Sequence, residues 1–305
     1  MYDIIIIGGG VAGLTAGLYA GRGGFKALII EKMFTGGQAA TTYEIDNYPG
    51  FDEGIGGPDL IMKMEKQARK FGAEIVYESV VDVDVEGIKK TVKTEKNIYQ
   101  AKALILAMGA NPRELGLDKE RKLRGAGISY CATCDGAFFR DKTVAVVGGG
   151  DTAVEDALFL ARFCPKVYLI HRRDSLRAVK VLQDAVLSNH KVKIIWDTTV
   201  EEILGEDTLK GIRIKNVKTG EVRQLDVEGL FIAVGVVPNS DIVKGKVETN
   251  QAGYIITDEN MQTNKFGVFA AGDIREKPLR QIVTAAADGA IAAYAAERYI
   301  NENRW

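Results

Sequence analysis

The chain has 305 residues, of which 46% are apolar and 27% are charged, so it is long enough for two soluble globular domains. Its formal net charge of -1 provides no basic field for nucleic acid or an anionic membrane, and no apolar run approaches bilayer-spanning length. The N-terminus has neither the basic segment nor the cleavage site of a signal peptide. The three cysteines, one close pair and one odd residue, fit the reducing cytoplasm, where a disulfide is catalytic rather than structural.

A dinucleotide-binding pattern opens the chain. The apolar run Asp3–Ile7 predicts a buried parallel strand, and G-x-G-x-x-G spacing follows at Gly8, Gly10 and Gly13. A helical pattern and a second apolar strand then lead to Glu31. These glycines allow a tight turn and close approach to a pyrophosphate at the helix N-terminus, while the acid accepts a hydrogen bond from a ribose hydroxyl.

The next segments carry less chemistry. Thr35–Gln38 and Asp46–Gly50 are loop-forming by composition, and Ile61–Phe71 predicts an amphipathic helix. The alternation over Ile75–Thr94 predicts a β-meander. The following apolar strand ends at Asn111-Pro112, which we interpret as the first crossing between two domains.

The pair Cys131 and Cys134 forms a lone C-x-x-C pattern, which is typical of half a zinc site, a redox pair or two inert thiols. Zinc usually needs a second pair of ligands, and Cys164, His171 and His190 provide none at ligand spacing, so no metal site is expected. The pair lies between two nucleotide-binding patterns, which favours the redox interpretation over the other two.

The nucleotide-binding pattern returns after the cysteine pair. A strand over Thr143–Val147 precedes G-x-G-x-x-A spacing, and the second strand ends at His171, where the first pattern has Glu31. Arginines at this position accommodate a 2′-phosphate, so the first pattern is expected to bind FAD or NAD and the second NADPH. A solvated basic helix start is the alternative for the arginines. The residues expected to bind NADPH are Gly148, Gly150, Asp151, Thr152, His171, Arg172, Arg173 and Arg177.

Near the C-terminus, a buried strand over Lys265–Ala271 ends in Gly272-Asp273. A carboxylate at the carboxyl end of a strand lies where α/β folds bind ligands, although a helix cap is the alternative. Val234–Asn239 marks the return crossing, and Arg280-Gln281 begins an alanine-rich helix that extends to about Ile300.

In combination, these patterns resemble the low-molecular-weight, bacterial-type thioredoxin reductases over essentially the full chain. The resemblance implies an α/β fold of two Rossmann-like domains, a discontinuous FAD domain (1–112 and 241–305) and an inserted NADPH domain (113–240). It also implies a cytoplasmic homodimer with FAD, NADPH, a redox-active Cys131–Cys134 disulfide and thioredoxin as substrate. The motifs that carry the resemblance are Gly8–Gly13, Cys131–Asp135, Gly148–Glu155, His171–Arg173, Gly272–Asp273 and Arg280–Ile282.

The resemblance also implies roles for individual residues. Asp135 would be the acid that protonates a leaving thiolate or flavin. Asp273 would hold the ribityl or pyrophosphate region, and Gln38 and Asn47 would line the flavin pocket. The residues expected to bind FAD are Gly8, Gly10, Gly13, Glu31, Gln38, Asn47, Gly109, Asp273, Arg280 and Gln281. Val11 stands where many relatives have proline, and both residues allow the turn.

Several alternatives remain at this point. Glutathione-reductase-like enzymes carry their dithiol beside the first nucleotide pattern, but Thr35–Ala40 here has no cysteine. A dithiol oxidase or a ferredoxin-fed reductase on the same scaffold would not need a 2′-phosphate pocket. A nucleotide-bound redox sensor would need the dithiol only as a switch. Because the disulfide and the nicotinamide must reach the same flavin, we expect the inserted domain to rotate about crossings near Pro112 and Pro238.

Overall fold

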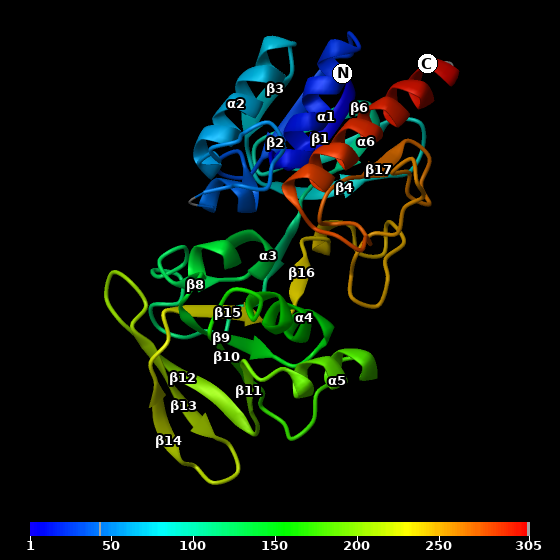
Figure 1. The fold of residues 1–305 in the computed structure, drawn as a ribbon. Coiled ribbons are helices and arrows are strands. Elements are labelled where there is room, and N and C mark those ends of the chain that lie inside the picture. Colours follow the sequence, from blue (N-terminus) through cyan, green and yellow to red (C-terminus); the bar gives the residue numbers. More distant parts are fainter. Residues whose placement is uncertain (43, 304–305) are drawn as a thin grey trace. The chain divides into compact units, whose positions relative to one another are not determined.

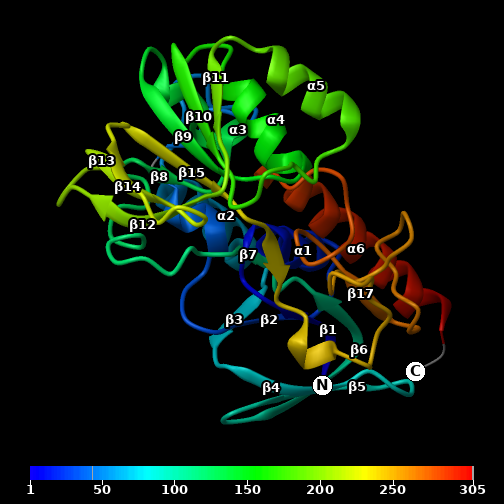
Figure 2. The same ribbon diagram turned by 90° about the horizontal axis from the view of Figure 1, so that it is seen from below.

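The computed structural model describes residues 1–42 and 44–303 and divides into two compact units (Figures 1 and 2). The first unit comprises Met1–Asn111 and Val237–Trp305, and the second comprises Pro112–Val236. Parallel strands form the centre of the sheet in each unit, with helices beside them, which confirms the predicted α/β class with two Rossmann-like units. Within the described residues, no helix combines the length and apolar character that a membrane crossing requires.

The sheet of the first unit has the strand order β3-β2-β1-β6-β5-β4, and β17 pairs with β6. Strand β1 is almost wholly apolar because it is covered on both faces. Its isoleucines point alternately into two separate clusters, which is the burial expected for a central parallel strand. The strands are β1 (Tyr2–Ile7), β2 (Ala27–Glu31), β3 (Glu74–Tyr77), β4 (Val80–Asp84), β5 (Lys90–Thr94), β6 (Ile98–Leu106) and β17 (Val268–Ala270).

Helices α1 (Val11–Arg22), α2 (Gly57–Lys70) and α6 (Ile282–Glu302) cover one face of this sheet. Helices α1 and α6 lie side by side in Figure 1, and they approach so closely that a Cβ on Gly289 would lie 2.2 Å from the carbonyl oxygen of Ala12. A larger residue at position 289 would therefore force the two helices apart. This contact fixes the start of α1 against the middle of α6.

The second unit repeats this plan. Its sheet has the order β11-β10-β9-β15-β8, in which neighbouring strands are parallel, and an antiparallel sheet of β12, β13 and β14 follows β11 in the chain. The helices are α3 (Ala132–Asp135), α4 (Asp151–Leu160) and α5 (Lys180–Ser188). The strands are β8 (Ile128–Ser129), β9 (Thr143–Gly148), β10 (Lys166–Ile170), β11 (Val192–Ile195), β12 (Thr198–Leu204), β13 (Gly211–Asn216), β14 (Val222–Leu225) and β15 (Gly229–Ala233).

The two chain crossings pair with each other. Strands β7 (Ala110–Pro112) and β16 (Val236–Pro238) form a two-stranded sheet. Backbone hydrogen bonds from Arg113 N to the Gly235 oxygen and from Asn239 N to the Gly109 oxygen lie on either side of it. The compact second unit ends at Val236, within β16.

The β-meander that we expected over Ile75–Thr94 is only partly present. Strand β3 is instead a parallel neighbour of β2, and only β4 and β5 form a meander, in which β4 is antiparallel to β5 and β5 is antiparallel to β6. Alternation of apolar and polar residues marks a half-buried strand but does not show which strand it pairs with or in which direction. An exposed edge strand of a parallel sheet has the same pattern.

Candidate functional site

The first glycine turn joins the end of β1 to the start of α1. Gly8 has φ +103°, and a Cβ there would lie 2.4 Å from the carbonyl oxygen of Ala107, so this position requires glycine. A Cβ on Gly13 would lie 1.9 Å from the Gly8 oxygen, whereas one on Gly10 meets nothing within 4 Å. Gly10 precedes a helix that has no side-chain cap and no acid in its first turn. The turn therefore presents open space and uncapped N–H groups, which suit a phosphate.

Glu31 ends β2 beside this turn. Its Oε2 accepts a hydrogen bond from the backbone N–H of Gly9 at 2.7 Å, and its Oε1 accepts one from Lys32 N–H at 2.7 Å. The carboxylate is thus held against the glycine turn, at the position where a ribose hydroxyl would be recognised.

Asp273 lies at the same edge of the sheet, just after β17. A Cβ on Gly272 would lie 2.9 Å from the Cβ of Ala12, so this loop contacts the start of α1. Within the described residues, Oδ1 of Asp273 and Nε of Arg280 are buried without a hydrogen-bond partner. Burial raises the pKa of Asp273, while Lys277 and Arg280 oppose that rise. Buried polar atoms without partners are costly, so they indicate a site that a polar ligand completes.

Two charged residues behind this loop were not predicted. Oδ2 of Asp288, on α6, accepts hydrogen bonds from the backbone N–H of Gly272 at 3.0 Å and from Nζ of Lys277 at 2.9 Å. Lys277 Nζ also lies 3.8 Å from Oδ1 of Asp273. The guanidinium of Arg280 lies 4.2 Å from the ring centre of Tyr254, which fixes its orientation.

A chain of amide side chains connects other predicted residues. Gln38 Nε2 donates to Asn111 Oδ1 at 2.7 Å, and Asn111 Nδ2 donates to Asn239 Oδ1 at 3.0 Å. Asn239 in turn donates through Nδ2 to the Met108 oxygen at 2.8 Å, next to Gly109. The sequence marked Asn111 and Asn239 only as crossing points, so this network was missed.

Asn47 and Gln281 are also brought together. Nδ2 of Asn47 donates to Oε1 of Gln281 at 3.2 Å, although 234 residues separate them. Gln281 is the N-cap of α6 and forms a capping box with Thr284. The loop that contains Asn47 is therefore tied to the start of α6.

The second glycine turn joins β9 to α4 and has the same form. A Cβ on Gly148 would lie 2.5 Å from the Ala233 oxygen, whereas one on Gly150 meets nothing within 4 Å. Asp151 begins α4, and its Oδ1 accepts a hydrogen bond from Val179 N–H at 2.7 Å. The backbone N–H of Arg177 donates to the Gly149 oxygen at 2.7 Å, so the arginine-bearing loop is fastened to the turn. Thr152 lies exposed at the start of the helix.

The His171 side chain packs against the backbone of this glycine turn. The ring is only 5% exposed, and a Cβ on Gly149 would lie 2.2 Å from its Nδ1. Its Nε2 lies 3.0 Å from the carbonyl oxygen of Ser175, and burial lowers the pKa of the ring. The imidazole therefore packs against the backbone that a nucleotide would contact.

Arg172, Arg173 and Arg177 point to solvent. All three are exposed, and none forms an ion pair with an acidic side chain in the described ranges 1–42 and 44–303. Exposed guanidinium groups beside an open glycine turn favour binding of an anion.

The cysteine pair begins α3, directly after β8. Cys131 and Cys134 form a disulfide with a Cα–Cα distance of 5.3 Å, and both residues are half-buried. Ser129, at the end of β8, donates through Oγ to Oδ2 of Asp135 at 2.6 Å and accepts from the backbone N–H of Cys131 at 3.0 Å. Asp135 is therefore held beside the disulfide. The sequence analysis missed Ser129, whose only signal is its position two residues before the pair.

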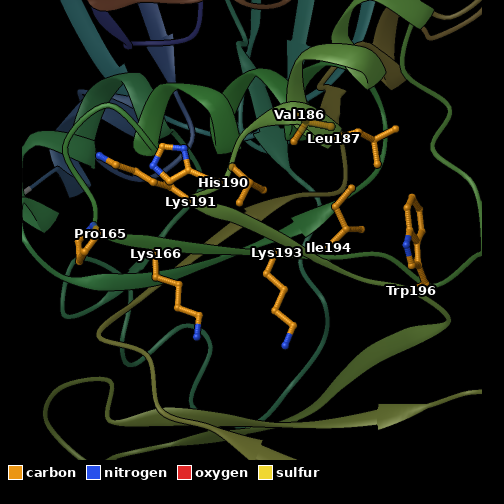
Figure 3. Close-up of a pocket in the computed structure, with 10 residues that line it drawn as sticks. Pro165, Lys166, Val186, Leu187, His190, Lys191, Lys193, Ile194 and Trp196 are labelled. Carbon is orange, nitrogen blue, oxygen red and sulfur yellow. The ribbon is translucent and has the colours of Figure 1, made fainter.

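The other thiol and a nearby depression are separate from these groups. Cys164 is fully buried, its Sγ donates to the Phe139 oxygen at 3.1 Å, and burial raises the pKa of the thiol to about 11. A depression of about 580 Å³ lies along the edge strand β11, with Lys166, Lys193 and Trp196 in its lining (Figure 3). No predicted site residue lines it. In the described part of the chain, no three His, Cys, Asp or Glu side chains gather as a metal site would require.

Comparisons with known proteins show the family of this chain. The family model described as pyridine nucleotide-disulphide oxidoreductase matches residues 2–289. The chain is 51% identical to a thioredoxin reductase of Peptoclostridium acidaminophilum, covering 99% of this chain and 98% of the relative, and 47% identical to one of Bacillus subtilis, covering 99% and 96%. The crystal structure of thioredoxin reductase from Streptococcus pyogenes superposes with a TM-score of 0.95 at 48% identity, covering 99% of each chain.

The two open glycines allow a paired test of the nucleotide sites. Gly10 and Gly150 both have extended backbone conformations and free space at Cβ, so valine at either position should leave the fold intact. Gly10→Val should weaken flavin nucleotide binding by roughly 100-fold, or about 2.7 kcal/mol, and leave nicotinamide nucleotide binding unchanged. Gly150→Val should do the reverse. Flavin absorbance and nucleotide titrations would measure this, and loss of both ligands in either variant would contradict the assignment.

Proposed function

Because the chain belongs to the pyridine nucleotide-disulphide oxidoreductase family and, within it, to the thioredoxin reductases, we propose that it transfers electrons from NADPH to oxidised thioredoxin. The observation that carries the proposal is the half-buried Cys131–Cys134 disulfide, which has Asp135 fastened beside it by Ser129. The same unit bears an open glycine turn and the exposed side chains of Arg172, Arg173 and Arg177.

The residues of the first unit fit FAD. The N-terminus of α1 is uncapped and faces open space at Gly10, where it would hold the pyrophosphate. Glu31 would accept from a ribose hydroxyl, and the unpartnered Oδ1 of Asp273 would accept from a further hydroxyl. The unpartnered Nε of Arg280 would donate to the flavin side of the ligand. A bound flavin supplies the hydride chemistry between the nicotinamide and the disulfide.

The residues of the second unit fit NADPH. Gly150 leaves room for the pyrophosphate at the start of α4, and Asp151 fastens the neighbouring loop. Arg172, Arg173 and Arg177 would surround a 2′-phosphate, which carries the charge that distinguishes NADPH from NADH. This pocket favours NADPH over ferredoxin as the donor, because ferredoxin has no 2′-phosphate to bind.

The disulfide performs the transfer to the protein substrate. On reduction, the bond between Cys131 and Cys134 accepts two electrons and two protons and opens to two thiols. The thiolate of Cys131 attacks one sulfur of oxidised thioredoxin, so that a mixed disulfide forms and the other thioredoxin sulfur leaves. Cys134 then attacks the mixed disulfide, which restores the Cys131–Cys134 bond and releases dithiol thioredoxin. Asp135 holds the proton that the leaving thiolate takes, and Ser129 keeps that carboxyl in place.

The nucleotide preference gives the first test. Arg172→Ala with Arg173→Ala should raise the KM for NADPH by roughly 10- to 100-fold, or about 1.4 to 2.7 kcal/mol, because two charged partners of the 2′-phosphate are lost. The KM for NADH should not change. Anaerobic stopped-flow measurement of flavin bleaching would measure both. Arg223→Ala, which removes an exposed arginine on β14, is the control. An equal rise in the KM for NADH would mean that Arg172 and Arg173 do not bind the 2′-phosphate.

The disulfide gives the second test. Anaerobic protein should be bleached by NADPH and should regain its oxidised flavin absorbance when oxidised thioredoxin is added. Cys131→Ser should still be bleached but should not recover, while Cys164→Ser, the control for the buried thiol, should recover as the wild type does. If the wild type is bleached but does not recover, its substrate is a disulfide other than that of thioredoxin. If oxygen alone restores the absorbance, the protein is a dithiol oxidase.

The proposal includes a homodimer. The first unit exposes large apolar side chains that a partner subunit would cover, among them Phe34, Phe266 and Tyr294. Light scattering of the purified protein should give twice the 33.2 kDa mass of the chain. A monomer mass at micromolar concentration would contradict this part of the proposal.

A further inference from the structure

A buried ion pair lies directly behind the loop that carries Asp273. Asp288 is 7% exposed and Lys277 is 9% exposed, and Lys277 Nζ lies 2.9 Å from Oδ2 of Asp288. That oxygen also accepts the backbone N–H of Gly272 at 3.0 Å, and NH1 of Arg275 lies 3.6 Å from it. One carboxylate oxygen therefore connects the end of β17, the following loop and helix α6.

We propose that Lys277 and Asp288 are positioning residues for the flavin site, which hold Asp273 where its carboxylate can accept a hydrogen bond from a hydroxyl of bound FAD. This inference rests on the proposed function, because it takes FAD as the ligand of the first unit. Neither residue would contact the ligand in this role. They would act through the backbone of Gly272 and through the charge beside Asp273.

The geometry fixes the loop from two directions. Helix α6, which carries Asp288, is locked to α1 by the close approach of Gly289 to the Ala12 oxygen. Gly272 has φ +81°, and a Cβ there would lie 2.9 Å from Ala12, so the loop itself also rests on α1. The hydrogen bond from Gly272 to Asp288 therefore sets the distance between Asp273 and the start of α1, where the pyrophosphate would bind.

The charges around Asp273 decide its protonation. Lys277 lies between two carboxylates, at 2.9 Å from Asp288 and 3.8 Å from Asp273. Burial raises the pKa of Asp273, Lys277 and Arg280 lower it, and Asp288 raises it further. Arg275 faces Asp288, and α1 contributes no acid from its first turn. Loss of the Lys277 charge would therefore raise the pKa of Asp273 and keep its carboxyl protonated to higher pH.

The test measures how much FAD the full-length protein releases on dilution. Flavin fluorescence detects the released FAD, and the measurement is repeated between about pH 5 and 9. Lys277→Gln keeps a donor for Asp288 but removes the charge. It should weaken FAD binding by about 10-fold at neutral pH, and its affinity should begin to fall at a higher pH than in the wild type as the solution is acidified. Lys277→Arg should restore the wild-type profile, because it returns the cation.

The control is the exposed pair Arg298 and Glu302 on the same helix, whose side chains are 61% and 64% exposed. Arg298→Gln should leave both the affinity and its pH profile unchanged. If Lys277→Gln does not fold, the double variant Lys277→Gln, Asp288→Asn replaces it, because an amide pair leaves no buried charge unpaired. A smaller shift of the pH profile in the same direction is expected for the double variant, because Asp288, which raises the pKa of Asp273, is lost together with Lys277, which lowers it more strongly.

Unchanged affinity and pH profile in the folded variant would overturn the inference. An equal loss of affinity at every pH would also overturn it, because that result would show only a structural role for the pair. Failure of the wild-type protein to retain FAD at all would instead overturn the proposed function on which the inference rests. The outcomes are therefore distinguishable from one another.

Discussion

Both units depend on one constraint, which is a helix that begins at the carboxyl end of a buried parallel strand without a side-chain cap. In the first unit, the close contact between Gly13 and the Gly8 oxygen brings α1 down onto the strand end. In the second, Ala153 is fully buried at the equivalent position, and Gly148 packs on the Ala233 oxygen. The first N–H groups of each helix are then available to bind an anion, and the neighbouring side chains determine which anion binds.

The surroundings differ between the units at the end of the second strand. Glu31 folds back onto the Gly9 N–H and places negative charge beside the first turn. His171 fills the same position in the second unit with a buried ring whose pKa is lowered by that burial, and the positive charge comes from Arg172 and Arg173 in the loop that follows. One scaffold thus presents an acid in one unit and cations in the other, although the strands and helices around each turn are alike.

The sequence was sufficient for those parts of the fold that local chemistry determines. Apolar runs, glycine spacing and the residue after each second strand are local signals, and the α/β class and both turns follow from them. The pairing of β3 was not predictable, because its alternating pattern is shared by an antiparallel strand. Ser129 and the Lys277–Asp288 pair were missed for a related reason. Each looks like an ordinary polar surface residue until the fold brings its partner close, and Asn47 meets Gln281 only across 234 residues.

The pairing of β7 with β16 has a consequence for how such a chain could arise. The second unit leaves the first at Ala110–Pro112 and returns at Val236–Pro238, and these two segments are neighbours in one small sheet. Its two ends therefore meet, as they do in domains that tolerate insertion into a host protein. A gene for a complete nucleotide-binding module could enter the gene of another at this point without breaking the host sheet. A short turn between β7 and β16 would be enough to close the first unit if the second were removed.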